Sequence, residues 1–389
     1  MKESLEESPE LRAEIVELIA QNGPISFAKY MELCLYHEPY GYYTSVRNRI
    51  GKQGDFFTSS SVHSLFGRLI SRQIAQLWQI MGEGPFTLVE QGAGEGYLCL
   101  DILDALAEEA PELYQQLEYR ILELSSDHRA RQGERLSAHV TAGRIKWHES
   151  SDLESFTGCF LSNELVDAFP VHVVEKRDNK LLEVMVNYVD GSFVEEFGPL
   201  TDSRIQDYFE LSQHPLVEGN RAEVNVASID WIDKVSSSLE KGAIITIDYG
   251  YPAAELLAPW RRAGTLLCYH RHQSSDNPYQ HIGCQDITAH VNFSLLEKIA
   301  GENGFETLYF GEQYRFLMGL GFVEELIRLQ ALETDPIRAQ ALRMTLKNLI
   351  LPEGGMGESF KVLLQGKGLG SSALLCARTI REIGLTSMM

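Results

Sequence analysis

The stretch LVEQGAGEGYLCLDIL, residues 88–103, carries glycines at three alternate positions. An apolar run ends in an acid, Glu90, then Gly92, Gly94 and Gly96 follow, and apolar residues return at helical spacing. A strand, a glycine turn and a helix in this order place bare backbone and a helix N-terminus at the carboxyl edge of a sheet. Open α/β folds bind nucleotide-like ligands at that edge. We therefore predict a ligand site at this turn.

The alternation of strands and helices continues on both sides of the glycine turn. Helices are predicted at 62–81, 97–108, 126–136, 226–239 and 294–303, and strands at 85–90, 118–123, 145–148, 158–162, 243–248 and 305–310. Strands that alternate with helices at this spacing form βαβ units and a parallel sheet. The predicted fold class is α/β, with a Rossmann-like doubly wound sheet.

Three further segments extend this core. The N-terminal lead-in shows helical apolar spacing at 9–21 and 26–36. Residues 171–224 are rich in strand formers, and the VDGS within them is typical of a hairpin turn, which predicts an antiparallel β insertion. Residues 313–350 have a helical pattern, and SFKVLLQG near the end resembles a last strand. The expected organisation is a lead-in and lid at 1–60, a core at 61–310 and a helical extension returning to the core at 311–389.

The composition is that of an ordinary globular protein. The 389 residues are 44% hydrophobic and 23% charged, and no apolar run approaches the roughly 18 residues that cross a bilayer. Six scattered cysteines without a CxxC pair indicate neither a zinc ribbon nor a disulfide framework. The acidic, amphipathic opening lacks the pattern of a secretion signal or a mitochondrial presequence. We expect a cytoplasmic protein.

The net charge of −21 bears on the partners of the chain. This charge would repel a polyphosphate at long range, so nucleic acid is a poor partner, whereas a basic protein substrate is easier to accommodate. Net charge also has a simpler reading, in which it only keeps the protein soluble.

The spacing of the glycines discriminates between two nucleotide-like ligands. The dinucleotide pattern GxGxxG would need a glycine at position 97, which is Tyr97, and Glu90 would repel a pyrophosphate. S-adenosylmethionine has no phosphate and a cationic tail, and EQGAGEG resembles the first motif, E/D-x-G-x-G-x-G, of class I methyltransferases. Glu123 ends the second predicted strand, where such enzymes receive the ribose hydroxyls. We predict S-adenosylmethionine as cofactor; a tight glycine turn without a ligand is the alternative.

The loop after the strand at 158–162 is where methyltransferases position the acceptor. It reads FLSNELVDAFPVH and lacks the D/N-P-P-Y/F/W of amino-methylating DNA enzymes. It offers Asn163, Glu164 and Asp167 instead. Two carboxylates can clamp a guanidinium, concentrate its lone pair on one nitrogen and offset the charge that accumulates as the methyl arrives. These three residues are the predicted catalytic group; alternatively the acids cap the following structure or bind the cofactor's amino group.

Several sequence blocks carry a resemblance to a known family. They are YMELCLYHEPYGYY, GDFFTSSSVHSLFG, VEQGAGEG, SNELVDAFPVH, IDYGY, GTLLCYHRH, DITAHVNF and MGESFKVL. The chain resembles the MidA family, which includes the mitochondrial complex I assembly factor that methylates an arginine of an iron–sulfur subunit. The resemblance implies a class I methyltransferase fold, S-adenosylmethionine as cofactor and a protein arginine as acceptor.

The resemblance also implies roles for individual residues. The predicted cofactor-binding residues are Glu90, Gly92, Gly94, Gly96, Glu123 and, in the block that closes the pocket, Gly54, Asp55 and Thr58. The predicted substrate-lining residues are Asp248, Tyr249 and His270. The chain departs from the family pattern at Ser60, Ser61 and Asn292, where the family often has other residues, and this puts the identity of the acceptor in doubt.

The remaining polar and aromatic clusters have simpler explanations. His270, His272, His281 and His290 lack the spacing of metal ligands, so no metal is predicted. The tyrosines of HEPYGYY, at 40, 42 and 43, either form a wall for a substrate or pack on the core.

Three functions stay open on the sequence alone. The first is a protein arginine methyltransferase, and the second is a methyltransferase for a small molecule or another protein side chain. The third is a non-catalytic assembly factor that binds S-adenosylmethionine. The acceptor, the number of methyl groups transferred and the oligomeric state are not predicted.

Overall fold

The structure is a computed structural model that describes residues 6–45, 63–149, 153–347, 349–350 and 360–379. The predicted cofactor residues Gly54, Asp55 and Thr58, and the departures at Ser60 and Ser61, lie outside the described residues. The chain forms two compact units. Unit 1 comprises Met1–Phe57, Val166–Ile232 and Tyr249–Ile299, and unit 2 comprises Thr58–Leu165, Asp233–Asp248 and Ala300–Met389.

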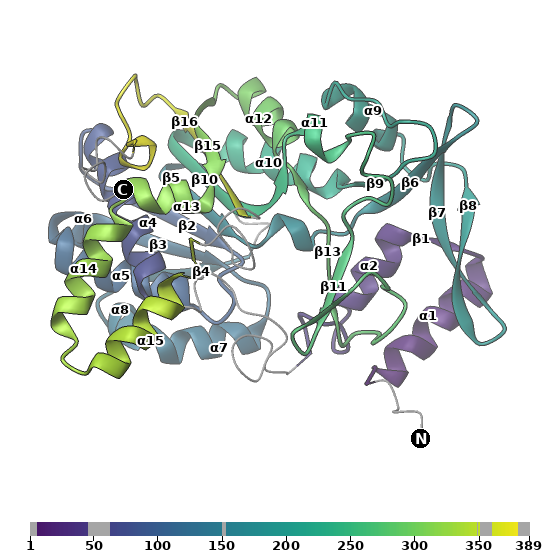
Figure 1. Ribbon diagram of the computed structural model, residues 1–389, viewed down its shortest axis with the longest axis horizontal. Helices are drawn as coiled ribbons and strands as arrows, with labels where there is room; N and C mark the ends of the chain where they lie inside the picture. Colours follow the sequence, from purple (N-terminus) through teal and green to yellow (C-terminus); the bar gives the residue numbers. More distant parts are fainter. Residues whose placement is uncertain (1–5, 46–62, 150–152, 348, 351–359, 380–389) are drawn as a thin grey trace. The chain divides into compact units, whose positions relative to one another are not determined.

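Unit 2 is built on the predicted sheet. Its strands lie in the order β15 (Glu306–Glu312), β16 (Phe360–Lys367), β10 (Leu239–Tyr251), β5 (Phe156–Asn163), β2 (Phe86–Gln91), β3 (Leu117–Leu122) and β4 (Ile145–His148) (Figure 1). The strands from β10 to β4 are parallel, and β15 is antiparallel to β16. The predicted α/β class with a doubly wound sheet is confirmed. The carboxyl ends of β2, β3 and β5 meet at one edge, where the glycine turn begins.

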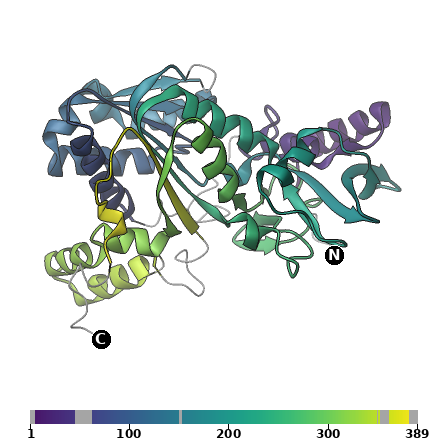
Figure 2. The same cartoon turned by 90° about the horizontal axis from the view of Figure 1, so that it is seen from above.

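Two helices flank the glycine turn in unit 2. Helix α4 (Leu65–Ile80) packs on α5 (Tyr97–Glu109), and their close approach needs Gly67, since a Cβ there would lie 2.5 Å from Cβ of Asp101. The other helices of this unit are α6 (Pro111–Gln116), α7 (Ser126–Arg135), α8 (Ser137–Thr141), α13 (Gln313–Gly319), α14 (Phe322–Leu332), α15 (Pro336–Lys347) and η3 (Leu375–Ala377). In Figure 2 the lime-green helices lie beside the dark-blue α4, which α13 and α14 contact.

Unit 1 contains the predicted antiparallel insertion. Its sheet has the order β1 (Ile25–Ser26), β7 (Lys180–Val189), β6 (His172–Arg177) and β9 (Arg221–Val224), with β8 (Ser192–Gly198) paired to β7. Asp190 and Gly191 join β7 to β8, and both have positive φ, at 51° and 87°. Two left-handed residues form the turn whose twist matches that of a hairpin. The hairpin pattern in VDGS is therefore confirmed.

The core of unit 1 lies between its sheet and two helices. Helices α1 (Pro9–Asn22) and α2 (Phe27–Tyr36), purple in Figure 1, bury an apolar stripe against β6, β7 and β8. Ser8 and Ser26 accept hydrogen bonds at the first turns of these helices, and these N-caps explain where the helices begin. The predicted helical lead-in is confirmed.

Several short elements of unit 1 have no clear pattern in the sequence. A three-stranded sheet consists of β12 (Gln273–Ser275), β11 (Leu267–His270) and β13 (Asp286–Thr288). Strands of three or four residues are too short to show a period of two. The other short elements are η2 (Val166–Ala168), α9 (Arg204–Leu211), α11 (Ala253–Leu256) and β14 (Val291–Asn292). The predicted helices at 226–239 and 294–303 are confirmed as α10 (Val226–Ser238) and α12 (Phe293–Glu302), and both continue into unit 2.

The boundaries of the two units differ from those of the predicted segments. Unit 1 joins the lead-in to the β insertion and to residues 249–299, because these segments share one apolar core. The organisation into a lead-in at 1–60, a core at 61–310 and an extension at 311–389 stays a prediction. None of the described helices is long and apolar enough to cross a membrane.

Candidate functional site

The glycine turn of unit 2 has the conformation that its three glycines allow. Gly92, Gly94 and Gly96 all have positive φ, at 80°, 51° and 82°. A Cβ at Gly92 would lie 3.1 Å from Cδ1 of Leu165, so a side chain would crowd the turn. Because L residues rarely adopt this conformation, the turn leaves bare backbone at the N-terminus of α5.

Glu123 follows β3 and lies beside this turn. Its Oε1 accepts a hydrogen bond from the backbone N–H of Ser125 at 2.8 Å, and its Oε2 lies 3.3 Å from Nε2 of Gln132 and 3.4 Å from Nδ1 of His128. These three contacts fix the orientation of the carboxylate. Glu123 thus presents a fixed acceptor at the carboxyl edge of the sheet, as the prediction of a ribose-binding acid requires.

Glu90 occupies a different environment from the one predicted for it. Its side chain is buried in the interior, where Oε2 accepts a hydrogen bond from the hydroxyl of Tyr119 at 2.7 Å. Burial raises the pKa of Glu90 to about 7, and the hydrogen bond from Tyr119 lowers it in part. The attraction to a cationic cofactor that was predicted for Glu90 therefore depends on pH, and its role in cofactor binding stays a prediction.

The loop after β5 begins with a strained turn. Glu164 has φ 53°, which is uncommon outside glycine, and its backbone N–H donates to the carbonyl of Ile247 at 2.9 Å. The carboxylate of Asp248, at the end of β10, accepts from the backbone N–H of Leu165 at 3.2 Å. Nδ2 of Asn163 donates to Oε1 of Glu164 at 2.9 Å. Asp248 therefore holds this turn, rather than lining only a substrate channel, and such strain is typical of functional positions.

Asn163 has an orphaned atom at the same edge of the sheet. Its side chain is buried, and its Oδ1 has no hydrogen-bond partner among the described residues. A buried acceptor without a partner costs free energy, so such atoms usually meet a ligand or water.

Asp167 lies in unit 1, on the other side of the division between Leu165 and Val166. It is buried in η2, where its backbone carbonyl accepts from Ala289 at 2.9 Å. The same region of unit 1 contains Tyr36, whose hydroxyl donates to the carbonyl of Ala168 at 2.9 Å. The predicted partners Glu164 and Asp167 thus belong to different units.

Asp286 is a second buried carboxylate in this part of unit 1. Its Oδ1 accepts from the hydroxyl of Tyr43 at 2.9 Å, and the ring of Tyr43 stacks on that of Tyr36 with centroids 5.5 Å apart. Burial, and then the negative charges of Asp286 and Asp167, raise the pKa values of both phenols. Both tyrosines therefore stay protonated and act as donors. We call Tyr36, Tyr43, Asp167 and Asp286 the acid–tyrosine cluster; sequence reasoning included Tyr43 only as a possible wall and missed Tyr36 and Asp286.

Two other predicted substrate residues lie elsewhere in unit 1. The ring of Tyr249 is parallel to that of His290, with centroids 6.3 Å apart. His270 stacks on His281 at 4.0 Å, and its Nδ1 bonds to the carbonyl of Cys284 at 2.8 Å. Burial, and then the charge of Arg261, lower the pKa of His290 to about 4, so that it is neutral. The substrate roles of Tyr249 and His270 stay predictions.

Asn292, one of the departures from the family pattern, makes three hydrogen bonds. Its Oδ1 accepts from the backbone N–H of Leu295 and caps α12, and its Nδ2 donates to Tyr208 and Ser212 at 3.2 Å and 2.9 Å. Asn292 therefore joins α12 to α9. The hydroxyls of Tyr208 and Ser212 could equally donate to an aspartate, so these bonds do not explain the departure.

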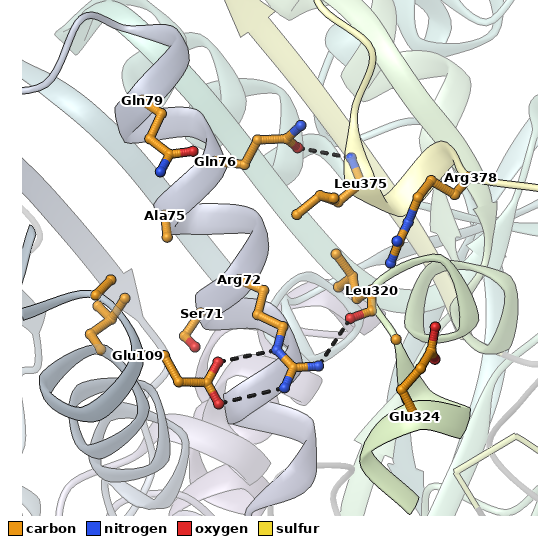
Figure 3. Close-up of a pocket in the computed structure, with 13 residues that line it drawn as sticks. Ser71, Arg72, Ala75, Gln76, Gln79, Glu109, Leu320, Glu324, Leu375 and Arg378 are labelled. Carbon is orange, nitrogen blue, oxygen red and sulfur yellow. Dashed lines mark hydrogen bonds and ion pairs between the residues drawn. The ribbon is translucent and has the colours of Figure 1, made fainter. Parts of the chain in front are cut away.

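The cavity shown in Figure 3 lies away from the glycine turn in unit 2. It has a volume of about 450 Å³ and is bordered by α4, by the connection between α13 and α14, and by η3. The guanidinium of Arg72 reaches Glu109 and the carbonyl of Leu320, and Gln76 accepts from the backbone of Leu375. None of the predicted site residues lines this cavity. Within the part of the chain that the structure describes, no three His, Cys, Asp or Glu residues are grouped to hold a metal ion.

Residues 69–311 match a family model described as an S-adenosyl-L-methionine-dependent methyltransferase. The chain belongs to this family. The methyltransferase is also similar to the crystal structure of a protein from Burkholderia thailandensis bound to S-adenosyl-homocysteine. The TM-score is 0.84 and the identity 33%, over 95% of each chain. A native crystal structure from the same organism gives 0.82 and 34%, over 95% of this chain and 94% of that one.

Curated relatives extend the comparison to animals. The mitochondrial protein arginine methyltransferase NDUFAF7 of Danio rerio is 29% identical over 88% of the methyltransferase and 83% of the relative. The human protein of the same name is 26% identical, over 88% and 80%. The predicted family resemblance, methyltransferase fold and cofactor are confirmed.

The residues at the glycine turn fit S-adenosylmethionine. The turn presents backbone without side chains at three positive-φ glycines, Glu123 presents fixed oxygens, and Asn163 offers its orphaned Oδ1. Gly92, Gly94 and Gly96 would hold the cofactor against the backbone, and Glu123 would hold its ribose.

Proposed function

We propose that the methyltransferase methylates an arginine side chain of a protein, held by the acid–tyrosine cluster. The observation that supports this acceptor is the pair of buried carboxylates, Asp167 and Asp286, beside the stacked rings of Tyr36 and Tyr43. A guanidinium is a planar fork of N–H donors that bonds carboxylates well and packs on aromatic faces. A neutral acceptor would gain much less from two acids.

The same residues of unit 1 would prepare a bound guanidinium for methylation. The cofactor supplies an electrophilic methyl group, so the chain has to orient the acceptor nitrogen and exclude water. The two aspartates would bond the N–H groups that do not react, which concentrates the lone pair on one nitrogen. They would also offset the positive charge that grows there. The protonated hydroxyl of Tyr43 keeps Asp286 in place by its 2.9 Å hydrogen bond.

Two other observations favour a protein acceptor. Curated relatives that match most of the chain are named protein arginine methyltransferases. The net charge of −21 would attract a basic protein surface at long range.

We further propose a respiratory complex I subunit as the acceptor, by the resemblance to the assembly factor, and a role in assembly of that complex. The proposed place of action is the cytoplasm, in keeping with six cysteines that are all free and buried.

Mass spectrometry of arginine methylation tests the proposal. Proteomes are compared from cells with the methyltransferase, without it, and without it but supplied with Asp286→Asn. We expect at least one arginine to lose about 14 Da or twice that without the enzyme. The wild type should restore the mark and Asp286→Asn should not. A proteome with unchanged arginine methylation, or full restoration by Asp286→Asn, would contradict the proposal; a lost methyl on a small molecule would favour the other acceptor class.

A further inference from the structure

Helix α7 is an unusual neighbour for a cofactor turn. Its sequence, SDHRARQGER, is almost entirely polar, so no apolar stripe holds it in place. Polar contacts do so instead. Arg135 and Arg131 pair with Glu95 inside the glycine turn, and Arg129 donates to the carbonyl of Glu123 at 2.8 Å. The helix is therefore fastened to both parts of the cofactor site.

Gln132 is the central contact of this helix. It is fully buried, and its Nε2 lies 2.7 Å from the carbonyl of Gly94 and 3.3 Å from Oε2 of Glu123. Its Oε1 accepts from the indole N–H of Trp147, on β4, at 2.8 Å. Its Cγ lies 3.3 Å from where a Cβ at Gly96 would be. One amide thus links the glycine turn, the ribose acid and the next strand.

We propose that Gln132 is a positioning residue for the cofactor, which fixes the glycine turn relative to Glu123 through its N–H donors. Without these donors the carbonyl of Gly94 loses its partner and Glu123 loses one of its three contacts. Both halves of the ligand site would then have to be ordered when the cofactor binds, and this lowers affinity. Gln132 therefore acts on the cofactor through Gly94 and Glu123, to which its amide is hydrogen-bonded.

Two substitutions separate the donors of Gln132 from its size. Gln132→Met keeps the length but removes all hydrogen bonds. Gln132→Glu keeps the length and the acceptor for Trp147, but loses the donors and places a carboxylate opposite Glu123. If packing alone were what matters, Gln132→Met, which keeps the length of the side chain, would behave as the wild type.

Gln73→Met is the matched control. Gln73 is also a fully buried helical glutamine of unit 2, and it accepts from the backbone of Cys376 at 3.1 Å. It contacts neither the glycine turn nor Glu123 through the hydrogen bonds that it makes. If the substitutions acted only by lowering stability, Gln73→Met and Gln132→Met should weaken S-adenosylhomocysteine binding to a similar extent.

Isothermal titration with S-adenosylhomocysteine tests the proposal on the full chain. We expect both Gln132 variants to bind about tenfold to a hundredfold more weakly than the wild type, and Gln73→Met to bind within about twofold of it. Wild-type affinity in Gln132→Glu, or an equal loss in Gln73→Met, would overturn the proposal. The measurement uses no acceptor, so its outcome is independent of whether the acceptor is an arginine.

Discussion

The cofactor turn of unit 2 and the acid–tyrosine cluster of unit 1 are built in opposite ways. The turn comes from one run of residues, 90–96, with Glu123 added at the end of the adjacent strand. The cluster takes one residue each from positions 36, 43, 167 and 286. The turn depends on backbone conformation, whereas the cluster depends on which side chains the fold of unit 1 brings together.

Because of this difference, we expect substitutions in the two regions to have different effects. A substitution in the glycine turn is strained, because L residues rarely adopt the positive φ that the turn requires. A change in the cluster alters one charge among several polar groups. We therefore expect losses of cofactor binding in unit 2 and losses of methyl transfer in unit 1.

The largest effect is expected for Gly94→Val. At φ 51° a β-branched residue is strained, and its methyl groups would occupy the space of the cofactor. Binding of S-adenosylhomocysteine should fall below detection in calorimetry. Gly143→Val is the control, since Gly143 has φ 70° but open space around its Cα, and it should bind normally. Similar loss in both variants would mean that strain alone explains the effect.

The second largest effect should show which carboxylate acts with Asp167. The structure favours Asp286, whereas the sequence predicted Glu164. Asp286→Asn should lower turnover about a hundredfold and leave S-adenosylhomocysteine affinity nearly unchanged. Glu164→Gln should do the same if the prediction from the sequence is right. Turnover is measured on the acceptor identified by mass spectrometry. Normal turnover in Asp286→Asn with a strong loss in Glu164→Gln would return the role to Glu164; Asp190→Asn, in the hairpin turn, is the control.

Glu90 should make the stability of unit 2 depend on pH. The pKa of Glu90 is about 7 in the folded chain, above its ordinary value of 4.5. Between these two pH values the folded chain therefore binds one more proton at Glu90 than the unfolded chain does. Stability from this group is therefore present at low pH and lost as the pH rises through 7, by on the order of 3 kcal/mol. Between pH 5 and pH 8 the melting temperature of Glu90→Gln should fall less than that of the wild type. If the melting temperatures of both proteins fell by the same amount, Glu90 would not be the source of the pH dependence.

The smallest effect is expected for Glu123→Ala. It removes an acceptor for the ribose hydroxyls, which should weaken S-adenosylhomocysteine binding about tenfold. Turnover at saturating cofactor should change little. Glu134→Ala, which changes an exposed acid on α7, is the control. Unchanged affinity in Glu123→Ala would remove this residue from the site.

The sequence by itself determined the α/β core and the cofactor turn. Alternating strands and helices, and glycines at 92, 94 and 96, are local patterns, because backbone conformation depends on residues adjacent in the chain. The hairpin at Asp190 and Gly191 was predictable for the same reason. The strands β11 and β13 were not, since a few residues show no period.

Only the tertiary structure decided which side chains share a site. Asp286 lies more than a hundred residues from Asp167, and the folding of unit 1 places both near the same two phenols. Gln132 gained its role because β3, β4 and α7 meet at one edge of the sheet. The raised pKa of Glu90 comes from burial. Burial and contact are properties of packing between distant segments, so no pattern along the chain encodes them locally.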